Sequence, residues 1–304
     1  MGTRFELVLE GLDPVHARAA GEAALEVILD CDSRWSRFRT DSLISRINRE
    51  AGMRAVRVDP LTFELLARCA QLERNSDGAF NVCVGVPMDR VRAKGAVSGP
   101  GPSGAFELDA QESTVRFTRA GTAIDLGSIG KGLALDLAAA SLTQAGVECA
   151  LLHGGTSSVI ALGAPADMRG GWRVALAAEF GGARANLEHR SLSVSAVRGA
   201  RCAEVGPARD AHVLDPRSGT LLQSDARAAV VCRSAADCDA WSTALLVLAA
   251  RESRLEFAAR LRGLATPSEF ACMVSDPGAG VFEHARGFGN AVFLPSTSNL
   301  ALAQ

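Results

Sequence analysis

Apolar residues that recur every three or four positions predict the helices of this chain. The predicted helices span residues 14–29, 41–48, 60–73, 130–145, 235–250 and 252–261. In the first of them, the face expected to be buried carries Val15, Ala19, Ala23, Val27 and Ile28. Asp59 and Pro60 supply an N-cap and a first-turn residue, so the third helix is expected to begin there.

Short runs rich in β-branched and apolar residues, bounded by turn residues, predict the strands. They span residues 3–9, 114–117, 122–126, 149–152, 157–162, 172–176, 192–196, 211–214, 228–231, 270–274 and 291–294. Strands and helices do not alternate regularly as in a doubly wound fold. The order favours an α+β class with a substantial antiparallel sheet.

One segment is rich in Gly, Pro and Ser and is expected to form a mobile surface loop, residues 93–105. Apolar runs of about 18 residues, which a membrane-spanning helix needs, do not occur. The first residues show no secretion signal, so a cytoplasmic location is expected from the sequence as it stands. A trimmed export signal would instead make the protein periplasmic.

Composition narrows the class of protein. Hydrophobic residues make up 48% of the 304 residues, which excludes a disordered chain. The net charge of -2 argues against a dedicated nucleic-acid binder. The eight cysteines form no CxxC pair and sit mostly in apolar stretches, which favours buried thiols in a reducing compartment. A few disulfides in an exported protein are the alternative.

Common nucleotide and hydrolase motifs are missing. The Gly130-Lys131 pair is not a P-loop, because Asp125 and Gly132 stand where that motif needs Gly and Ser or Thr. The sequence also lacks a GxGxxG after a strand, an HExxH and a nucleophile elbow. These absences argue against a P-loop NTPase, a Rossmann dehydrogenase, a zinc protease and an α/β-hydrolase.

Three dispersed segments could carry chemistry. Residues 125–132 form a glycine-rich turn that opens a helix, which suits an anion; a tight turn without a ligand explains these residues equally well. Residues 212–219 place His212 and Asp215 around a strand end, where His could act as a base or the Asp could simply cap the turn. Asp239 and Thr243 share one helix face, and their side-chain oxygens are hard ligands suited to Mg²⁺. A simpler interpretation is that Asp239 is a first-turn carboxylate that interacts with the helix dipole and that the Thr243 hydroxyl bonds to the backbone.

Taken together and in order, seven segments resemble the motifs of the ApbE family of FAD:protein FMN transferases. They are residues 1–3, 36–48, 77–81, 125–132, 154–163, 212–219 and 239–245. The resemblance extends over nearly the whole chain. It implies an α+β fold of the T-fold kind, in one ApbE-like flavin transferase domain over residues 1–304, with two intimate subdomains as an alternative.

The resemblance also implies an activity. Family members split FAD with the help of Mg²⁺, release AMP and attach FMN to a Thr or Ser of a target protein; some hydrolyse FAD to FMN and AMP instead. Position by position, the residues implied to line the FAD site are Met1, Phe38, Ala79, Phe80, Asn81, Asp125, Lys131 and Val213. Phe38 would face the isoalloxazine. The implied Mg²⁺ ligands are Ser128, Asp239 and Thr243, and His212 would be the acid or base.

The chain departs from the family pattern at several places, which include Ser242 in place of Ala and the lack of a Trp-Gly element after Gly85. Asn81 and Thr156 stand where the family has Asp, and residues 193–198 read Ser-Val-Ser-Ala-Val-Arg in place of a TSG run. These departures leave two alternatives to flavin transfer. One is an FAD-binding paralogue with weakened catalysis, and the other is an FAD pyrophosphatase.

Overall fold

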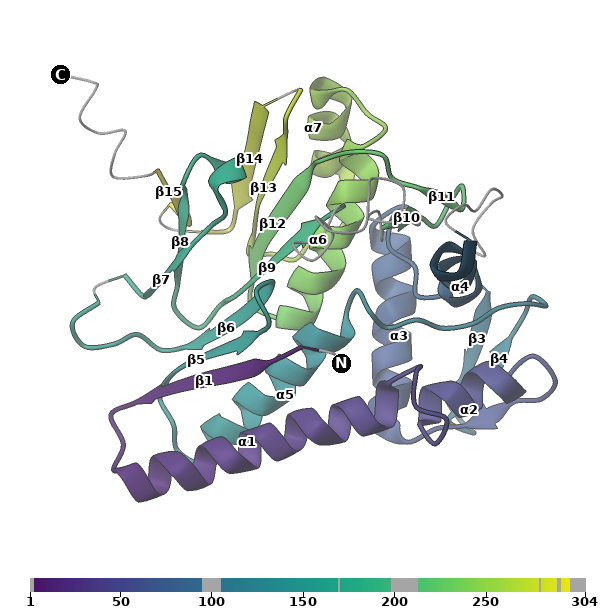
Figure 1. Cartoon of the computed structure of the whole chain (residues 1–304), viewed down its shortest axis with the longest axis horizontal. Helices are drawn as coiled ribbons and strands as arrows, with labels where there is room; N and C mark the ends of the chain where they lie inside the picture. Colours follow the sequence, from purple (N-terminus) through teal and green to yellow (C-terminus); the bar gives the residue numbers. More distant parts are fainter. Residues whose placement is uncertain are drawn as a thin grey trace.

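A seven-stranded antiparallel sheet forms the centre of the molecule (Figure 1). The computed structural model describes residues 3–94, 105–168, 170–197, 213–278, 280–288 and 291–295. The strand order is β1-β5-β6-β9-β12-β13-β14. The strands span Phe5–Glu10 (β1), Cys149–Gly154 (β5), Ser158–Leu162 (β6), Ser191–Ala196 (β9), Arg227–Cys232 (β12), Phe270–Asp276 (β13) and Gly280–Arg286 (β14). The predicted α+β class with a largely antiparallel sheet is confirmed.

Three helices cover one face of this sheet. They are α1 (Pro14–Trp35), α5 (Gly130–Gln144) and α6 (Ala235–Ala249). Helix α1 packs on α5, α5 packs on α6, and α6 lies on β9 and β12. Successive residues of a strand point to opposite faces, so Ala228 and Val230 of β12 enter this core, whereas Ala229 and Val231 enter a second core behind the sheet.

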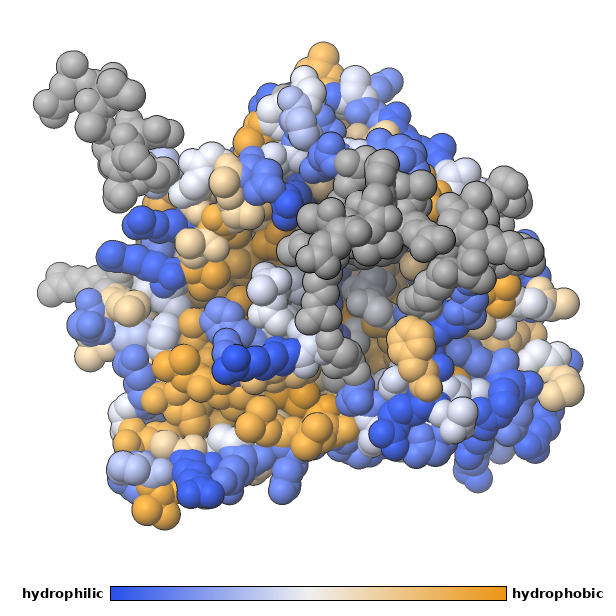
Figure 2. Space-filling view, in the orientation of Figure 1, coloured by the Kyte–Doolittle hydropathy of each residue, from blue (hydrophilic) through white to orange (hydrophobic). Residues whose placement is uncertain are grey.

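The second core is closed by a small sheet of order β15-β8-β7. Its strands span Trp172–Ala175 (β7), Arg184–Leu187 (β8) and Phe293–Leu294 (β15), and a 3₁₀ turn, η1, spans Ala178–Phe180. Trp172 and Phe293 pack here with Leu151 and Met273 of the large sheet. Apolar surface continues over β1, β5 and β6 in the lower left of Figure 2.

The remaining elements lie mainly beside the end of α1, on the right of Figure 1. They are α2 (Leu43–Glu50), α3 (Pro60–Asn75), α4 (Gly85–Lys94), a sheet of β2 (Val56–Arg57), β4 (Thr114–Phe117) and β3 (Phe106–Asp109), and a hairpin of β10 (Leu214–Asp215) and β11 (Thr220–Leu221). Helix α7 (Arg254–Gly263) follows α6. Among the residues described, no helix is long and apolar enough to cross a membrane.

Local sequence signals fix where the helices begin. Asp13 and Asp59 cap α1 and α3 through their side chains, and each is followed by a proline in the first turn. The expected start of the third helix is therefore confirmed. The last helix begins at Arg254 rather than at 252, because Ser253 and Glu256 form a capping box there.

The buried face predicted for α1 is wrong at three of its five positions, whereas Ile28 is buried and Val27 half-buried as expected. Val15 is 79% exposed, and Ala19 and Ala23 are exposed as well. The buried residues of this helix are Ala20, Ala24, Ile28, Cys31 and Trp35. Because alanines occupy neighbouring positions, the sequence does not show which side of the helix is its apolar face. Packing against α5 buries the side that continues to Cys31 and Trp35.

The strand predicted at 122–126 is also wrong, since this segment is irregular. Its backbone is satisfied without a sheet partner. The Asn48 side chain accepts from Ile124 N at 2.7 Å and donates to Ile124 O at 3.0 Å, and Asp125 N donates to Val82 O at 2.8 Å. Side-chain and loop partners thus replace the ladder that an extended apolar run suggests.

The loop predicted over 93–105 lies largely outside the described residues. Ala93 and Lys94 end α4, and Ala105 is buried just before β3. Residues 211 and 212 of the strand predicted at 211–214 are also outside the described part.

The hydrophobic pattern missed α4, β2, β3, β8, β11 and β14. β14 is the outer strand of the large sheet, and its mostly exposed residues carry little apolar signal.

Candidate functional site

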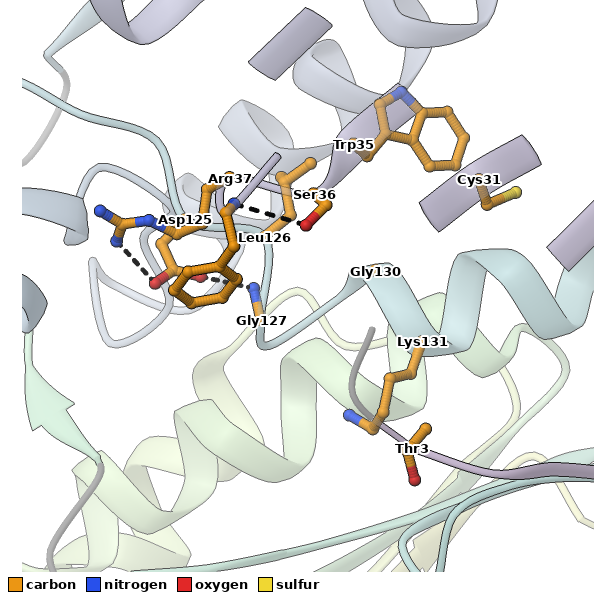
Figure 3. Close-up of a pocket in the computed structure, with 11 residues that line it drawn as sticks. Thr3, Cys31, Trp35, Ser36, Arg37, Asp125, Leu126, Gly127, Gly130 and Lys131 are labelled. Carbon is orange, nitrogen blue, oxygen red and sulfur yellow. Dashed lines mark hydrogen bonds and ion pairs between the residues drawn. The ribbon is translucent and has the colours of Figure 1, made fainter. Parts of the chain in front are cut away.

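A pocket of about 310 Å³ lies beside the first turn of α5 (Figure 3). Its described lining comes from the end of α1, the loop that follows and the turn leading into α5. The lining residues are Thr3, Cys31, Trp35, Ser36, Arg37, Phe38, Asp125, Leu126, Gly127, Gly130 and Lys131. The pocket therefore brings together three of the predicted site residues, Phe38, Asp125 and Lys131.

Serine side chains of α2 hold the loop 36–38 in place. Ser42 Oγ donates to the Ser36 carbonyl at 2.6 Å and accepts from Ser45 N, which caps α2. Ser45 Oγ donates to the Arg37 carbonyl at 3.1 Å. Phe38 lines the pocket and is 73% exposed, with the Arg37 guanidinium carbon 5.7 Å from the centre of its ring; an aromatic ring in a pocket wall suits a planar ligand.

Arg37 is the main lining residue that the sequence reasoning missed. Its Nη1 donates to Asp125 Oδ2 at 2.9 Å and to the Gly85 carbonyl at 3.1 Å, while Nη2 pairs with Asp89 Oδ2 at 2.6 Å. The side chains of Arg37 and Asp125 are each 10% exposed. A forked guanidinium can bridge two carboxylates in this way. No local signal distinguished Arg37 from the exposed Arg39, because the partners of Arg37 lie far along the chain.

The turn into α5 is organised by Asp125 and by backbone contacts. Asp125 Oδ1 accepts from Gly127 N at 2.9 Å, and Gly130 N donates to the Leu126 carbonyl at 2.8 Å. The N-cap residue, Ile129, offers no side-chain hydrogen bond to the helix. Helix α5 therefore begins with first-turn N–H groups that no N-cap side chain satisfies, and Lys131 adds a charge to the same end.

The first turn of α5 is tied to α6 by Asp239. Asp239 Oδ2 accepts from Gly132 N at 2.9 Å and lies 3.3 Å from Lys131 Nζ. Asp239 Oδ1 accepts from Ser158 Oγ and from Ser193 Oγ, both at 2.7 Å. The carboxylate is 3% exposed. Two sheet strands and two helices thus meet at this side chain.

Further hydroxyl groups continue this network. Ser195 Oγ lies 2.7 Å from Ser242 Oγ and 3.2 Å from Thr243 Oγ1. Thr243 Oγ1 donates to the backbone carbonyl of Asp239 at 3.2 Å. The serines at 193 and 195 belong to the segment that replaces the family's TSG run, and they give β9 a hydroxyl-rich end that faces α6.

The residues expected to hold Mg²⁺ have suitable oxygen chemistry, but their arrangement does not fit a metal site. Both oxygens of Asp239 are already engaged, one of them by the ammonium group of Lys131. Thr243 is bonded to the backbone of its own helix. In the described part of the chain, no three His, Cys, Asp or Glu side chains gather as metal ligands do. Ser128 lies half-buried in the turn before α5.

The other predicted flavin residues are not among the described lining residues of this pocket. Ala79 and Phe80 are 1% and 2% exposed and belong to the main core. Asn81 Nδ2 donates to Glu73 Oε1 at 3.0 Å, and its Oδ1 accepts from Cys83 N at 2.6 Å. Met1 and His212, and so the predicted acid or base, lie outside the described residues.

Val213 begins a well-anchored turn. It is 7% exposed, and its carbonyl accepts from Leu222 N at 2.9 Å. Asp215 is buried and pairs with two arginines, Arg217 at 3.1 Å and Arg251 at 2.8 Å. Asp215 therefore acts as a structural anchor that holds the 215–220 turn against the end of α6.

Burial also sets the chemistry of Cys31 in the pocket wall. Desolvation raises the pKa of its thiol to about 11. The thiol stays protonated at neutral pH and is a poor nucleophile there. This cysteine therefore serves as packing.

The geometry defines an α+β protein with a pocket at the start of a helix, bounded by an exposed aromatic ring, a cation and a carboxylate. The sequence model of the ApbE family matches residues 1–266. The chain belongs to the ApbE family.

The names of two curated relatives state an activity of those proteins. The chain is 28% identical over 263 residues to the FAD:protein FMN transferase of Rhodobacter capsulatus, covering 81% of this chain and 50% of that protein. It is 29% identical over 295 residues to the FAD:protein FMN transferase of Treponema pallidum, covering 83% and 80%. The chain thus spans half the length of the first relative and four fifths of the second.

Solved structures share the fold. The crystal structure of the ApbE protein of Thermotoga maritima superposes with a TM-score of 0.76 at 20% identity, over 92% of this chain and 93% of that one. The flavinyl transferase ApbE of Pseudomonas stutzeri gives a TM-score of 0.69 at 23% identity, over 95% of each chain. At these identities the likeness establishes the architecture alone.

Proposed function

We propose that this chain transfers the FMN part of FAD to a Thr or Ser hydroxyl of a target protein and releases AMP. The observation that carries the proposal is the grouping of Phe38, Asp125 and Lys131 around one pocket at the start of α5. An exposed ring suits the flat isoalloxazine, and a cation at a helix N-terminus suits a pyrophosphate. Membership of the ApbE family and the names of the curated relatives support the same reaction.

In the proposed reaction, the acceptor hydroxyl oxygen attacks the phosphorus of the FMN half of FAD. The bond from this phosphorus to the bridging oxygen breaks, and AMP leaves with that oxygen. The hydroxyl proton passes to a base, for which His212 is the proposed group. The ammonium group of Lys131 and the positive end of the α5 dipole stabilise negative charge on the phosphate oxygens during the transfer. No step is assigned to a metal ion, because the oxygens of Asp239 are engaged by protein donors.

Incubating the chain with FAD and a peptide that carries an acceptor Thr tests the proposal. AMP should appear together with a flavin-labelled peptide, in equal amounts. A peptide with Val at the acceptor position is the matched control, since it has the same shape and no hydroxyl. The reaction should be run both with Mg²⁺ and with EDTA.

The two alternative activities correspond to other outcomes of this experiment. AMP with free FMN and an unlabelled peptide would establish an FAD pyrophosphatase, in which water is the acceptor. FAD that binds and stays intact under both metal conditions would establish a binding paralogue. Either outcome would contradict the proposed transfer.

A further inference from the structure

The carboxylate of Asp239 is enclosed by protein donors on both oxygens. A carboxylate offers about four lone-pair sites. Ser158, Ser193, Gly132 and Lys131 supply one donor each, so each oxygen has two partners. A divalent cation could bind this carboxylate only by displacing one or more of these donors.

Three of the four donors are fixed in the interior. Ser158 and Ser193 are cross-strand partners in β6 and β9 and are 0% and 1% exposed. The third donor is a backbone N–H group in a tightly packed helix contact. A Cβ at Gly132 would lie 2.6 Å from Ala236 N, so α5 and α6 touch at the backbone there. The Gly132 N–H cannot leave Asp239 without moving the helices, and a serine hydroxyl that turned away from the carboxylate would lose its charge-assisted hydrogen bond in the interior.

Lys131 is the exception, because it also faces the pocket. Its side chain is 25% exposed and belongs to the pocket lining, while its Nζ lies 3.3 Å from Asp239 Oδ2. An ammonium group carries three N–H donors. Lys131 can therefore remain paired with Asp239 and still donate to a ligand in the pocket. The carboxylate restrains the ammonium at the start of α5.

We propose that Asp239 is the internal counter-ion of Lys131 and not a metal ligand in this chain. Resting on the proposed function, the inference is that Lys131 and the α5 N-terminus meet the anionic diphosphate of FAD directly, with no divalent cation held between them by Asp239. Asp239 is then a positioning residue for Lys131. The hydroxyl groups of Ser158 and Ser193, together with Gly132 N and Lys131, occupy the lone pairs that a metal would need.

Titrating the full chain with Mn²⁺ and following the free ion by electron paramagnetic resonance tests the metal part without any variant. The wild type should bind no stoichiometric Mn²⁺ when free of FAD. Any Mn²⁺ bound in the presence of FAD should be unchanged by Asp239→Asn, since it would belong to the phosphates alone. One Mn²⁺ per chain that is lost in Asp239→Asn would overturn the proposal.

Flavin fluorescence titrations test the role of Lys131. The wild-type dissociation constant for FAD should be the same in EDTA and in Mg²⁺. Lys131→Met, which keeps the length of the side chain and removes its charge, should raise it about 10- to 100-fold in both buffers. Asp239→Asn should also raise the dissociation constant for FAD. Asp109 is an exposed residue in β3, so the control variant Asp109→Asn should have the dissociation constant of the wild type.

Two results would count against the inference in this second experiment. They are a wild-type affinity that falls when EDTA removes Mg²⁺, or an unchanged affinity in Lys131→Met. A wild type that binds no FAD at all would defeat the proposed function, while the Mn²⁺ titration of the free chain would still decide whether Asp239 holds a metal.

Discussion

The guanidinium of Arg37 pairs with the carboxylate of Asp125 across 88 residues of sequence, with Nη1 and Oδ2 at 2.9 Å. The contact joins the loop after α1 to the turn before α5, so it ties the two walls of the pocket together. Asp89 at 2.6 Å adds α4 to the same cation. Arg37 is therefore a positioning residue for the pocket, and Asp125 depends on it for its place.

Replacing Arg37 with Met should loosen the pocket. Asp125, a largely buried carboxylate, would lose its contact with the Arg37 guanidinium, so the free energy of unfolding should fall by about 3 kcal/mol, and the affinity for FAD should fall with it. Urea unfolding and flavin fluorescence measure the two effects. Arg39→Met is the matched control, because Arg39 is 47% exposed and its surface pair with Asp41 should contribute less than about 1 kcal/mol. Equal effects of the two substitutions would remove Arg37 from this role.

The start of α5 offers a second matched pair, Gly132→Ala and Gly130→Ala. A Cβ at Gly132 would overlap the backbone of Ala235 and Ala236, which cannot move away without separating two helices. We expect Gly132→Ala to lower the free energy of unfolding by more than about 2 kcal/mol. A Cβ at Gly130 meets only Leu126 Cβ at 3.7 Å, so that variant should change stability by less than about 1 kcal/mol. Chemical denaturation of both variants measures which one loses more stability. If the only effect of replacing glycine were on the entropy of the unfolded chain, the two variants would change by similar amounts.

Asn81 stands where the resemblance to the ApbE family implies Asp, and its contact with Glu73 favours the amide. Its amide donates to Glu73 Oε1 at 3.0 Å, a contact that a carboxylate at position 81 would turn into a repulsion. Asn81→Asp should cost about 1–3 kcal/mol at neutral pH, because the residue is 4% exposed. The double variant with Glu73→Gln should recover most of the loss, since Gln can donate to the new carboxylate. A double-mutant cycle with no coupling would show that Glu73 is not the cause.

His212 carries the proposed acid–base step. His212→Ala should lower the transfer rate about 10²- to 10⁴-fold while FAD still binds. The wild-type rate should also fall as the pH drops below about 6.5, the ordinary pKa of histidine, because a protonated ring accepts no proton. Single-turnover transfer to the acceptor peptide measures both. A transfer rate that is unaffected by the substitution would assign the base to another group.

Local signals in the sequence were reliable guides to the fold. Asp13 and Asp59 mark helix starts because a capping carboxylate acts on the residues next to it, and the apolar runs of β12 and β13 mark strands buried on both faces. The buried side of α1 could not be chosen in this way, because Ala19 and Ala20 are equally apolar and only packing on α5 separates them.

The pocket was predictable in part for the same reason. Phe38, Asp125 and Lys131 follow from motifs that occupy short stretches of sequence. The partners of Arg37 and the four donors around Asp239 come from distant elements, so no spacing in the sequence reveals them. The metal-ligand role expected for Asp239 stays a prediction from resemblance, and the contacts around it led to the opposite proposal.

Two capping aspartates should respond to pH in opposite directions. Asp136 of α5 caps the start of α6, accepting from Ala235 N at 2.7 Å and from Ala236 N at 3.0 Å. Burial is the largest effect and raises the pKa of Asp136 to about 6, above its ordinary value, despite these hydrogen bonds. Asp13 caps the exposed start of α1, where the hydrogen bond from His16 N is the main cause that lowers the pKa of its carboxyl.

The sign of each effect follows from proton binding. Between about pH 4 and pH 6 the folded chain holds a proton at Asp136 that the unfolded chain has lost, so this group makes the free energy of unfolding fall as the pH rises through that window, by up to about 3 kcal/mol. Above pH 6 the contribution of Asp136 is constant.

Asp13 acts the other way. Its stabilisation is present above the pKa of the unfolded chain and is lost as the pH falls through the lower pKa of the folded chain. Urea unfolding from pH 4 to pH 7 should therefore show the stability advantage of the wild type over Asp136→Asn shrinking as the pH rises, whereas its advantage over Asp13→Asn should stay nearly constant, because the Asp13 window lies below about pH 4. Parallel pH profiles for the two variants would mean that Asp136 is ionised in the folded chain throughout this range, and that its hydrogen bonds to the start of α6 outweigh its burial.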